Sequence, residues 1–335
     1  MGRDFADKLA RRRLYSHVPE AEDGAVLADY LAAHFSRFDR AGWIRAVEAG
    51  LVTVNDVHAV PETKLKRHDR VDYFPPDTPE PDANLTFRVV HEDADLLVID
   101  KPGDLCVHPT GPFFRHTLWH LVGIQYGEIR FVHRLDRETS GLVVAARTRR
   151  AAAAMDNGGT PVRKEYLALV TGDFRGQVHA EGFIVRDRAS VVPKKKRFVF
   201  ADSPEAADAR LDPSAETAVT DLVEESHVPP DMTLVRAVLG TGRQHQVRAT
   251  LHSLGFPLAG DKLYGPDERL FLKIKTQTLT GSDRALLRFG RQALHAAVLE
   301  FRHPFTGENL RFESTFPWAD FRLTAPHPQH PQKGS

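Results

Sequence analysis

The sequence predicts a two-domain protein in which helices and strands are mixed. Between residues 24 and 75, a helical repeat of apolar residues gives way to short alternating strands. A stretch rich in proline and acid, residues 75–81, separates this part from the rest. Beyond it, apolar runs bounded by turn residues indicate buried strands, the first at residues 96–100. A length of 335 residues is sufficient for two cores.

These observations place the domain limits. We expect a flexible N-terminus over residues 1–20, a small domain over 21–76, a linker over 77–84, a larger domain over 85–322 and a disordered tail over 323–335. The first segment is polar, and the tail is rich in proline and histidine. Neither segment offers the apolar surface that a packed element needs.

The elements of the small domain follow from apolar spacing. Leu27, Tyr30, Leu31 and His34 recur at helical intervals and predict a first helix. A second, short helix is expected to end near Gly50. Two strands follow, at residues 52–54 and 71–73, and a turn at Asn55-Asp56 comes directly after the first of them.

The larger domain reads mostly as strands. Apolar or alternating runs predict strands at residues 96–100, 142–146, 164–170, 217–223 and 233–239. Helices are expected at 151–155 and through Leu254, a break at 157–159, and a last strand near Leu294 followed by a turn. Residues 173–215 lack a clear period, so we expect exposed loops or an insertion there.

One stretch carries the chemistry. Residues 131–142 read F-V-H-R-L-D-R-E-T-S-G-L, with the acid Asp136 between Arg134 and Arg137. The turn and the apolar run that follow place Asp136 on a loop feeding a buried strand, where a rigid scaffold presents it. A carboxylate there needs a cationic partner. An isolated H-R-x-D string is more typical of a surface ion-pair turn.

This string resembles the signature of the RluA-type pseudouridine synthases, H-R-L-D-x-x-T-S-G-L, at every position. Residues 241–248 resemble a second family string, T-G-R-x-H-Q-I-R, with Val247 in place of Ile. Lys164 and Tyr166 match K-x-Y, and residues 101–109 match K-P-x-G-x-x-V-H-P, except that Asp104 stands where Gly is usual. The resemblance covers the chain from about residue 85 to 317.

The resemblance implies conversion of uridine in RNA to pseudouridine, without a cofactor or metal. It implies an α+β fold with a mixed, mostly antiparallel central sheet and the site in a cleft across it. Asp136 would act at the sugar, Arg248 would be its salt-bridge partner, and Tyr166 would stack on the uracil. The expected RNA contacts in this domain are His133, Arg134, Arg243 and His245.

The small domain resembles the S-four-like RNA-binding module, named after a ribosomal protein. The match lies in residues 43–45, 50–55 and 69–71. Arg37, Arg45, Lys64 and Arg67 are expected to meet phosphates, which supply most sequence-independent affinity. The alternative is a small cap on the main domain, because residues 29–70 hold seven basic and six acidic residues and so are nearly neutral.

Composition limits which partners, metal sites and membrane segments the chain can have. The formal net charge is zero, so RNA contact must depend on local patches, such as residues 128–150 with six Arg against three acids. A single cysteine, Cys106, allows no internal disulfide and makes a zinc site improbable. No apolar run approaches membrane-spanning length, and residues 1–17 lack the apolar region of a secretory signal. We expect a cytoplasmic monomer whose partner is RNA, ribosomal or transfer, with the small domain favouring ribosomal RNA.

Two other classes of function stay open at this point. The first is a non-catalytic RNA-binding or ribosome-assembly protein on the same scaffold, although Asp136, Tyr166 and Arg248 are all intact. The second is a carboxylate-dependent glycoside hydrolase, which ordinarily uses two acids where only one has motif support. Product analysis separates them, because isomerisation retains uracil in the chain, hydrolysis releases it, and binding changes nothing.

Overall fold

The computed structural model describes residues 3–156 and 160–321, with two units that are each compact. One unit takes in the chain up to residue 81 together with residues 110–115 and 120–128. The other takes in residues 82–109, 116–119 and 129 onward. The predicted break at 157–159 and the predicted tail from 323 lie outside the described residues.

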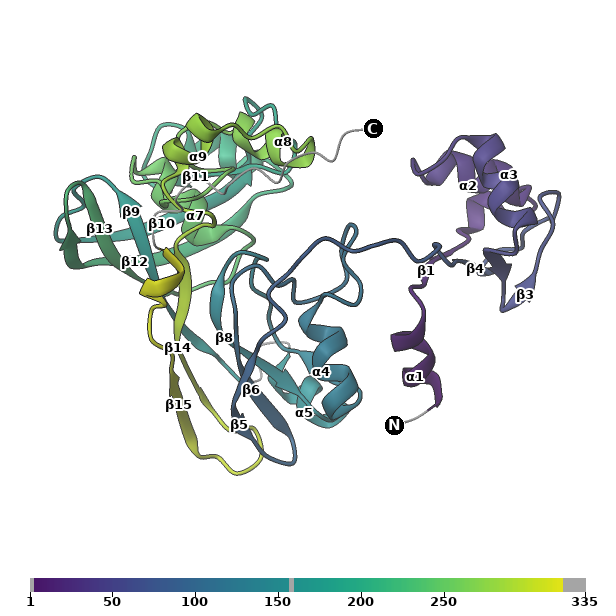
Figure 1. Ribbon diagram of the computed structural model, residues 1–335, viewed down its shortest axis with the longest axis horizontal. Helices are drawn as coiled ribbons and strands as arrows, with labels where there is room; N and C mark the ends of the chain where they lie inside the picture. The colour runs from purple at the N-terminus through teal and green to yellow at the C-terminus, as the bar shows by residue number, and fades with distance from the viewer. Residues whose placement is uncertain (1–2, 157–159, 322–335) are drawn as a thin grey trace, which may run out of the picture. The chain divides into compact units, whose positions relative to one another are not determined.

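The first unit holds a four-stranded antiparallel sheet together with helices. Its sheet has the order β1-β4-β2-β3. The unit's elements are α1 (Arg3–Ala10), β1 (Leu14–His17), η1 (Glu20–Glu22), α2 (Leu27–His34), α3 (Arg40–Glu48), β2 (Val52–Val54), β3 (Val57–His58) and β4 (Arg70–Tyr73). The two predicted helices and the two predicted strands are present (Figure 1).

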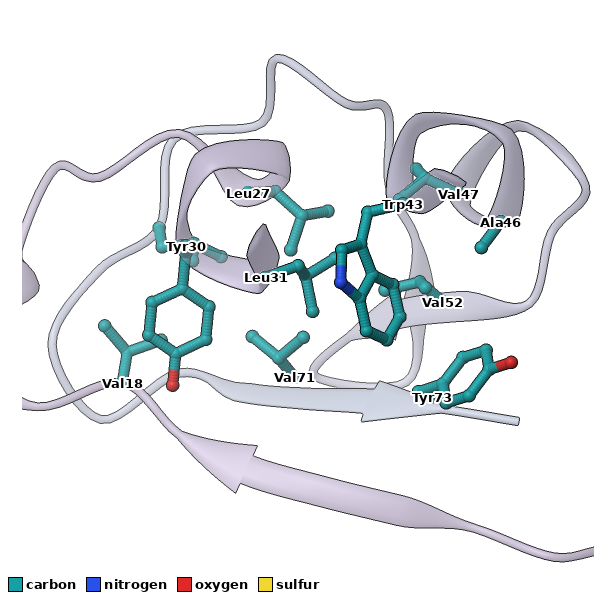
Figure 2. Packing of buried hydrophobic residues seen from close by; sticks show 11 residues of the cluster. Val18, Leu27, Tyr30, Leu31, Trp43, Ala46, Val47, Val52, Val71 and Tyr73 are labelled. Atoms are coloured by element: carbon teal, nitrogen blue, oxygen red, sulfur yellow. The ribbon is translucent and has the colours of Figure 1, made fainter. Parts of the chain in front are cut away.

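Local sequence explains where these elements begin and end. The Asp39 carboxylate accepts a hydrogen bond from the Gly42 amide at 2.7 Å and so caps the start of α3. Asn55 and Asp56 both have positive φ, as a tight turn from β2 to β3 requires. Figure 2 shows the core of this unit, in which Leu31 and Trp43 of the two helices pack towards the sheet.

The prediction of a poorly ordered N-terminus was wrong. Phe5 and Leu9 of α1 are buried, and both lie against Gly123. Strand β1 pairs with β4 along its whole length, and the Arg13 guanidinium donates to the buried Asp72 carboxylate at 2.5 Å. The composition of this segment is mostly polar for two reasons. An edge strand pairs through its backbone, and the helix needs apolar residues on one face only.

The second unit holds an eleven-stranded sheet with the order β11-β10-β12-β13-β9-β14-β8-β6-β5, while β15 pairs with β14 and β7 with β8. Among the described strands, β8 and β14 form the one parallel pair. The mixed, mostly antiparallel sheet is therefore confirmed (Figure 1). The strands are β5 (Arg88–Glu92), β6 (Leu96–Lys101), β7 (Arg130–Phe131), β8 (Ser140–Ala146), β9 (Arg163–Thr171), β10 (Gln177–Arg186), β11 (Lys196–Phe200), β12 (Glu216–Val228), β13 (Met232–Leu239), β14 (Leu294–Arg302) and β15 (Asn309–Glu313).

Helices pack on both halves of this sheet. Helix α5 lies against β8, and α6 and α7 lie against β10 and β11. The helical segments of this unit are α5 (Arg149–Met155), α6 (Ala206–Leu211), α7 (Gln246–Ser253), α8 (Arg269–Lys275), α9 (Gly281–Leu287) and η2 (Trp318–Phe321). Helix α4 (Leu118–Tyr126) begins in this unit, but its residues from 120 onward belong to the first unit. Each half has its own buried apolar cluster, so strand β14 joins two separately packed regions.

Two expectations for this unit were wrong. Residues 173–215 are not loops, because they form β10, β11 and α6. The strand pattern was obscured by Gly182, where a Cβ would come within 2.0 Å of the Val199 carbonyl oxygen, and by polar residues on the exposed face. Strand β14 is also not the last, since β15 follows it with polar and apolar residues that alternate.

Close approach of β8 and β14 requires glycine at position 141. Gly141 has a φ of +106°, and a Cβ there would lie 2.2 Å from the Ala296 carbonyl oxygen. We expect Gly141→Ala to lower the free energy of unfolding by at least about 2 kcal/mol, measured by urea denaturation, because left-handed strain and overpacking add. Gly255→Ala is the control, with φ +86° and no atom within 4 Å, and should cost only about 1 kcal/mol. Equal losses in the two variants would contradict the steric argument.

Candidate active site

The loop that carries Asp136 connects β7 to β8. A buried lysine, Lys101, is hydrogen-bonded to its backbone. The Lys101 ammonium donates to the carbonyl oxygens of Pro102, Leu105 and Arg137, at 2.7, 2.8 and 3.2 Å. Only 1% of Lys101 is exposed. Burial lowers its pKa to about 7, and the nearby Arg291 charge acts in the same direction. Lys101 therefore ties the end of β6 to the Asp136 loop.

The departure from the family string at Asp104 is accommodated by backbone conformation. Asp104 has a φ of +63°, the left-handed conformation that glycine adopts freely and that aspartate tolerates better than most residues. Its carboxylate accepts from Arg137 at 2.9 Å. At Gly103, a Cβ would lie 2.4 Å from the Arg291 Nε, so a larger residue there would displace the Arg291 side chain.

At the centre of the site, one guanidinium bridges two carboxylates. Arg248 donates through one terminal nitrogen to Asp136 Oδ2 at 2.6 Å. Its Nε and other terminal nitrogen donate to the two oxygens of Asp261, at 2.7 and 2.9 Å. The ion pair of Arg248 with Asp136 expected from the sequence is thus present, and Asp261 orients the guanidinium from behind.

The two carboxylates differ in exposure. Asp261 is fully buried and also accepts from the backbone amides of Leu263 and Tyr264, each at 2.9 Å. Burial favours the neutral acid, but the Arg248 charge and these hydrogen bonds outweigh it and lower the Asp261 pKa to about 2. The side chain of Asp136 keeps 27% of its surface exposed. Burial acts to raise its pKa too, but the Arg248 and His245 charges leave it below the usual value.

His245 lies beside Asp136, directly before helix α7. Helix α7 begins at Gln246, and His245 precedes it with a φ of 60°. Its Nε2 is 3.8 Å from Asp136 Oδ1, and its Nδ1 is 3.0 Å from the Tyr264 hydroxyl. Burial and the Arg248 charge lower the pKa of His245 to about 4, so the imidazole is neutral at pH 7.

A pocket opens over these groups, and Tyr166 forms part of its wall. Its lining includes Arg134, Asp136, Tyr166, Arg243 and Arg248. Tyr166 is 8% exposed, and burial together with the Asp136 charge raises the pKa of its hydroxyl. The sheet brings them together, because Ala296 of β14 pairs with Gly141 of β8 and with Tyr166 of β9.

The predicted RNA contacts differ in their surroundings. Arg134 is exposed at the pocket, and the Arg243 Nε donates to the Thr217 carbonyl oxygen at 3.0 Å. His133 Nε2 instead accepts from the Val144 amide at 3.4 Å, so this imidazole faces the protein. In the first unit, the predicted contacts are all exposed: Arg37, Arg45, Lys64 and Arg67. Their roles stay predictions.

Sequence reasoning missed three residues that shape the site. Nothing in the spacing of Asp261 and Tyr264 indicates that they contact Arg248 and His245. The Gln246 side chain accepts from the Thr241 hydroxyl at 2.8 Å and from the Arg243 amide at 2.9 Å, and so orders the loop before α7. Within the described part of the chain, no three His, Cys, Asp or Glu side chains gather as metal ligands would.

Comparison with known proteins gives the same family throughout. A sequence model of the RNA pseudouridylate synthase family matches residues 95–253. The ribosomal large subunit pseudouridine synthase D of Pasteurella multocida is 30% identical over 323 residues, which cover 92% of this chain and 93% of that protein. The protein of the same name from Vibrio cholerae is 33% identical over 312 residues, 90% of each chain.

A solved structure agrees. Human RNA pseudouridylate synthase domain containing 1 has 25% sequence identity and a TM-score of 0.53, over 71% of this chain and 87% of that one. None of the helices described in residues 3–156 and 160–321 has the length and apolar character of a membrane span. The chain belongs to the RluA-type family of RNA pseudouridylate synthases, and it is an isomerase that converts uridine in RNA to pseudouridine.

Proposed function

We propose that this enzyme isomerises uridines of large-subunit ribosomal RNA, with Asp136 as its catalytic aspartate. The observation that carries the choice of RNA is the match along nine-tenths of the chain to two proteins named for the ribosomal large subunit. That match takes in most of the first unit, and within this unit we propose an S-four-like RNA-binding domain at 21–76. A linker at 77–84 and a catalytic domain at 85–322 complete the proposed organisation.

The geometry supports a carboxylate that is ionised when the RNA arrives. Arg248 lies 2.6 Å from Asp136 and favours its charged form, while the partial exposure of Asp136 leaves it accessible from the pocket. The target base must leave its stack to enter, which costs a few kcal/mol and is cheapest in loops. Asp136 then acts at the sugar by one of two routes, attack on the sugar carbon or removal of a sugar proton.

Tyr166 and the cations around the pocket complete the proposal. Tyr166 has an aromatic face suited to stacking on a single uracil. Arg134, exposed beside Asp136, would fill the gap that the extruded nucleotide leaves in the RNA. Arg243 and His245 would contact RNA or order the loop before α7. His133, which faces the protein, is the weakest of the proposed RNA contacts. We further propose a cytoplasmic protein that works as a monomer and needs no cofactor.

The test is tritium release from uridine labelled at C5, in total RNA from a strain lacking the gene and separated by size. Wild-type enzyme and Asp136→Asn are compared on each fraction. Release by wild type from the large ribosomal RNA alone supports the proposal. Release from the transfer RNA fraction instead would show that the activity is correct but that the substrate is transfer RNA. Binding without release from any fraction would favour the non-catalytic, ribosome-assembly function.

The proposed RNA-binding role of the small domain has its own test. Arg45 is an exposed residue of α3 with no ion pair among the described side chains, whereas Arg40 on the same helix pairs with Asp29 at 2.6 Å. We expect Arg45→Ala to weaken RNA binding about threefold to tenfold and to reduce the salt dependence by about one phosphate contact. Arg40→Ala is the control and should change both less. Filter binding between 50 and 200 mM KCl measures both, and unchanged affinity in Arg45→Ala would favour the cap interpretation.

A further inference from the structure

Lys164 is a partly buried cation without a partner. It lies on β9, two residues before Tyr166, so the two side chains share one face of the strand. Among the described residues, its ammonium has neither an acid within ion-pair distance nor a hydrogen-bond acceptor. Burial lowers its pKa, and no acid counteracts this effect. The ammonium is thus partly removed from water without compensation.

Lys164 lies next to residues that line the pocket, because its cross-strand partner Leu239 and the residue after Gly242, Arg243, are both part of the lining. A Cβ on Gly242 would lie 3.5 Å from Lys164 Nζ, which puts the ammonium against the turn before Arg243. The Lys164 charge also depresses the pKa of His133, which burial alone already lowers, to about 3. The Lys164 ammonium therefore lies against the loop before α7, and its charge acts on His133 in the loop that carries Asp136.

Among the described residues of this unit, three lysines are more deeply buried than Lys164, and each of them is paired with an acid or fully hydrogen-bonded. Lys101 donates to three carbonyl oxygens, Lys195 to Glu268 at 2.9 Å, and Lys262 to Glu138 at 2.6 Å. The acid beside Lys164 in sequence, Glu165, points to the opposite face and bonds Arg236 at 2.9 Å. A partly buried ammonium without a counter-charge is less favourable than a paired one, so we explain its position by an anion that arrives from outside.

We propose that Lys164 forms a phosphate subsite, which binds one phosphodiester group of the RNA strand next to the target uridine. This proposal rests on RNA being the substrate of the enzyme. It does not depend on whether that RNA is ribosomal or transfer RNA. The phosphodiester is the anion that every RNA brings within a few ångströms of its bases, and ammonium groups bind it as point charges. Because Lys164 and Tyr166 share a face, one would hold the backbone while the other receives the base.

The kinetic test compares Lys164→Met with Lys164→Arg on whichever RNA fraction the wild type modifies. We expect Lys164→Met to raise KM about tenfold with kcat within about twofold, and Lys164→Arg to restore most of the loss. Arg163→Met is the matched control, since Arg163 lies on the same strand but already pairs with Glu165 and Glu300. A fall in kcat at unchanged KM would overturn the proposal and indicate a role in proton transfer.

A second measurement identifies the anion. Short RNAs containing the mapped uridine receive a single uncharged methylphosphonate linkage at each position in turn. Wild type should lose about tenfold in affinity at one linkage close to the uridine, and Lys164→Met should lose nothing further there. If Lys164→Met remains as sensitive as wild type at every linkage, the ammonium does not contact a phosphate. Because folding affects all linkages alike, a misfolded variant is distinguished from a lost contact.

Discussion

Asp136→Asn should reduce turnover by at least about 10³-fold while the protein remains folded. The amide keeps the shape of the carboxylate and can still lie beside Arg248, but it is neither a nucleophile nor a base at neutral pH. Single-turnover tritium release from C5-labelled RNA measures the loss, and urea denaturation measures stability. We expect the stability change to be small beside the loss of activity, because Asp136 is partly exposed and Asp261 continues to pair with Arg248.

The control for this variant is Asp104→Asn. Asp104 lies beneath the same loop and pairs with Arg137, and asparagine tolerates its left-handed backbone equally well. We expect activity within a fewfold of wild type there. Turnover by Asp136→Asn close to wild type would remove Asp136 from the catalytic role, and an equal loss in both variants would indicate a general effect on the loop.

Arg248→Met should lower the free energy of unfolding at pH 7 by about 3–5 kcal/mol, the range for a buried pair that loses one partner. Two carboxylates would then face each other, with Asp261 fully buried and without its counter-charge. Turnover should fall as well, since the charge that keeps Asp136 ionised is lost. Arg248→Lys is the control, and it should recover part of the stability but less of the activity, because an ammonium cannot bridge both acids.

The stability difference between the wild type and Arg248→Met should depend on pH. In the wild type, the Asp261 pKa is about 2, below its unfolded value of about 3.9, so the stability from the pair is complete above about pH 5 and is lost as pH falls towards 2. Without Arg248, burial raises that pKa above the unfolded value, and the variant gains relative stability on acidification. The difference between the two proteins should shrink below pH 4. A difference independent of pH would show that packing, not charge, accounts for the loss.

Much of the site could be named in advance because its residues lie in long, continuous strings. Asp136, Tyr166 and Arg248 were each assigned from strings of defined spacing, and the structure brings all three to one pocket. Apolar periodicity also placed α2, α3, β6, β8 and β9 correctly. The role of Asp261 could not be predicted, because the spacing of residues does not encode a contact between side chains thirteen positions apart.

The errors share a physical cause. The N-terminal segment and β10 are stabilised by backbone pairing and by partners distant in sequence, so their own composition did not reveal them. The hydrogen bond of the Val144 amide to His133 could not be predicted from the sequence either, because Val144 lies on the strand that follows the loop. Lys164 is the opposite case, because a lysine in an alternating strand gives no sign of whether an acid will face it.

The sequence by itself determined the family, the aspartate to test and the positions of several strands along the chain, because these depend on local patterns that do not require the fold. The tertiary structure alone decided which charges are shared and which stand unpaired. Arg248 binds two carboxylates, whereas Lys164 meets none, and both facts arise from strands and helices that meet across the sheet. Electrostatic energy depends on distance and burial, and folding sets both of these.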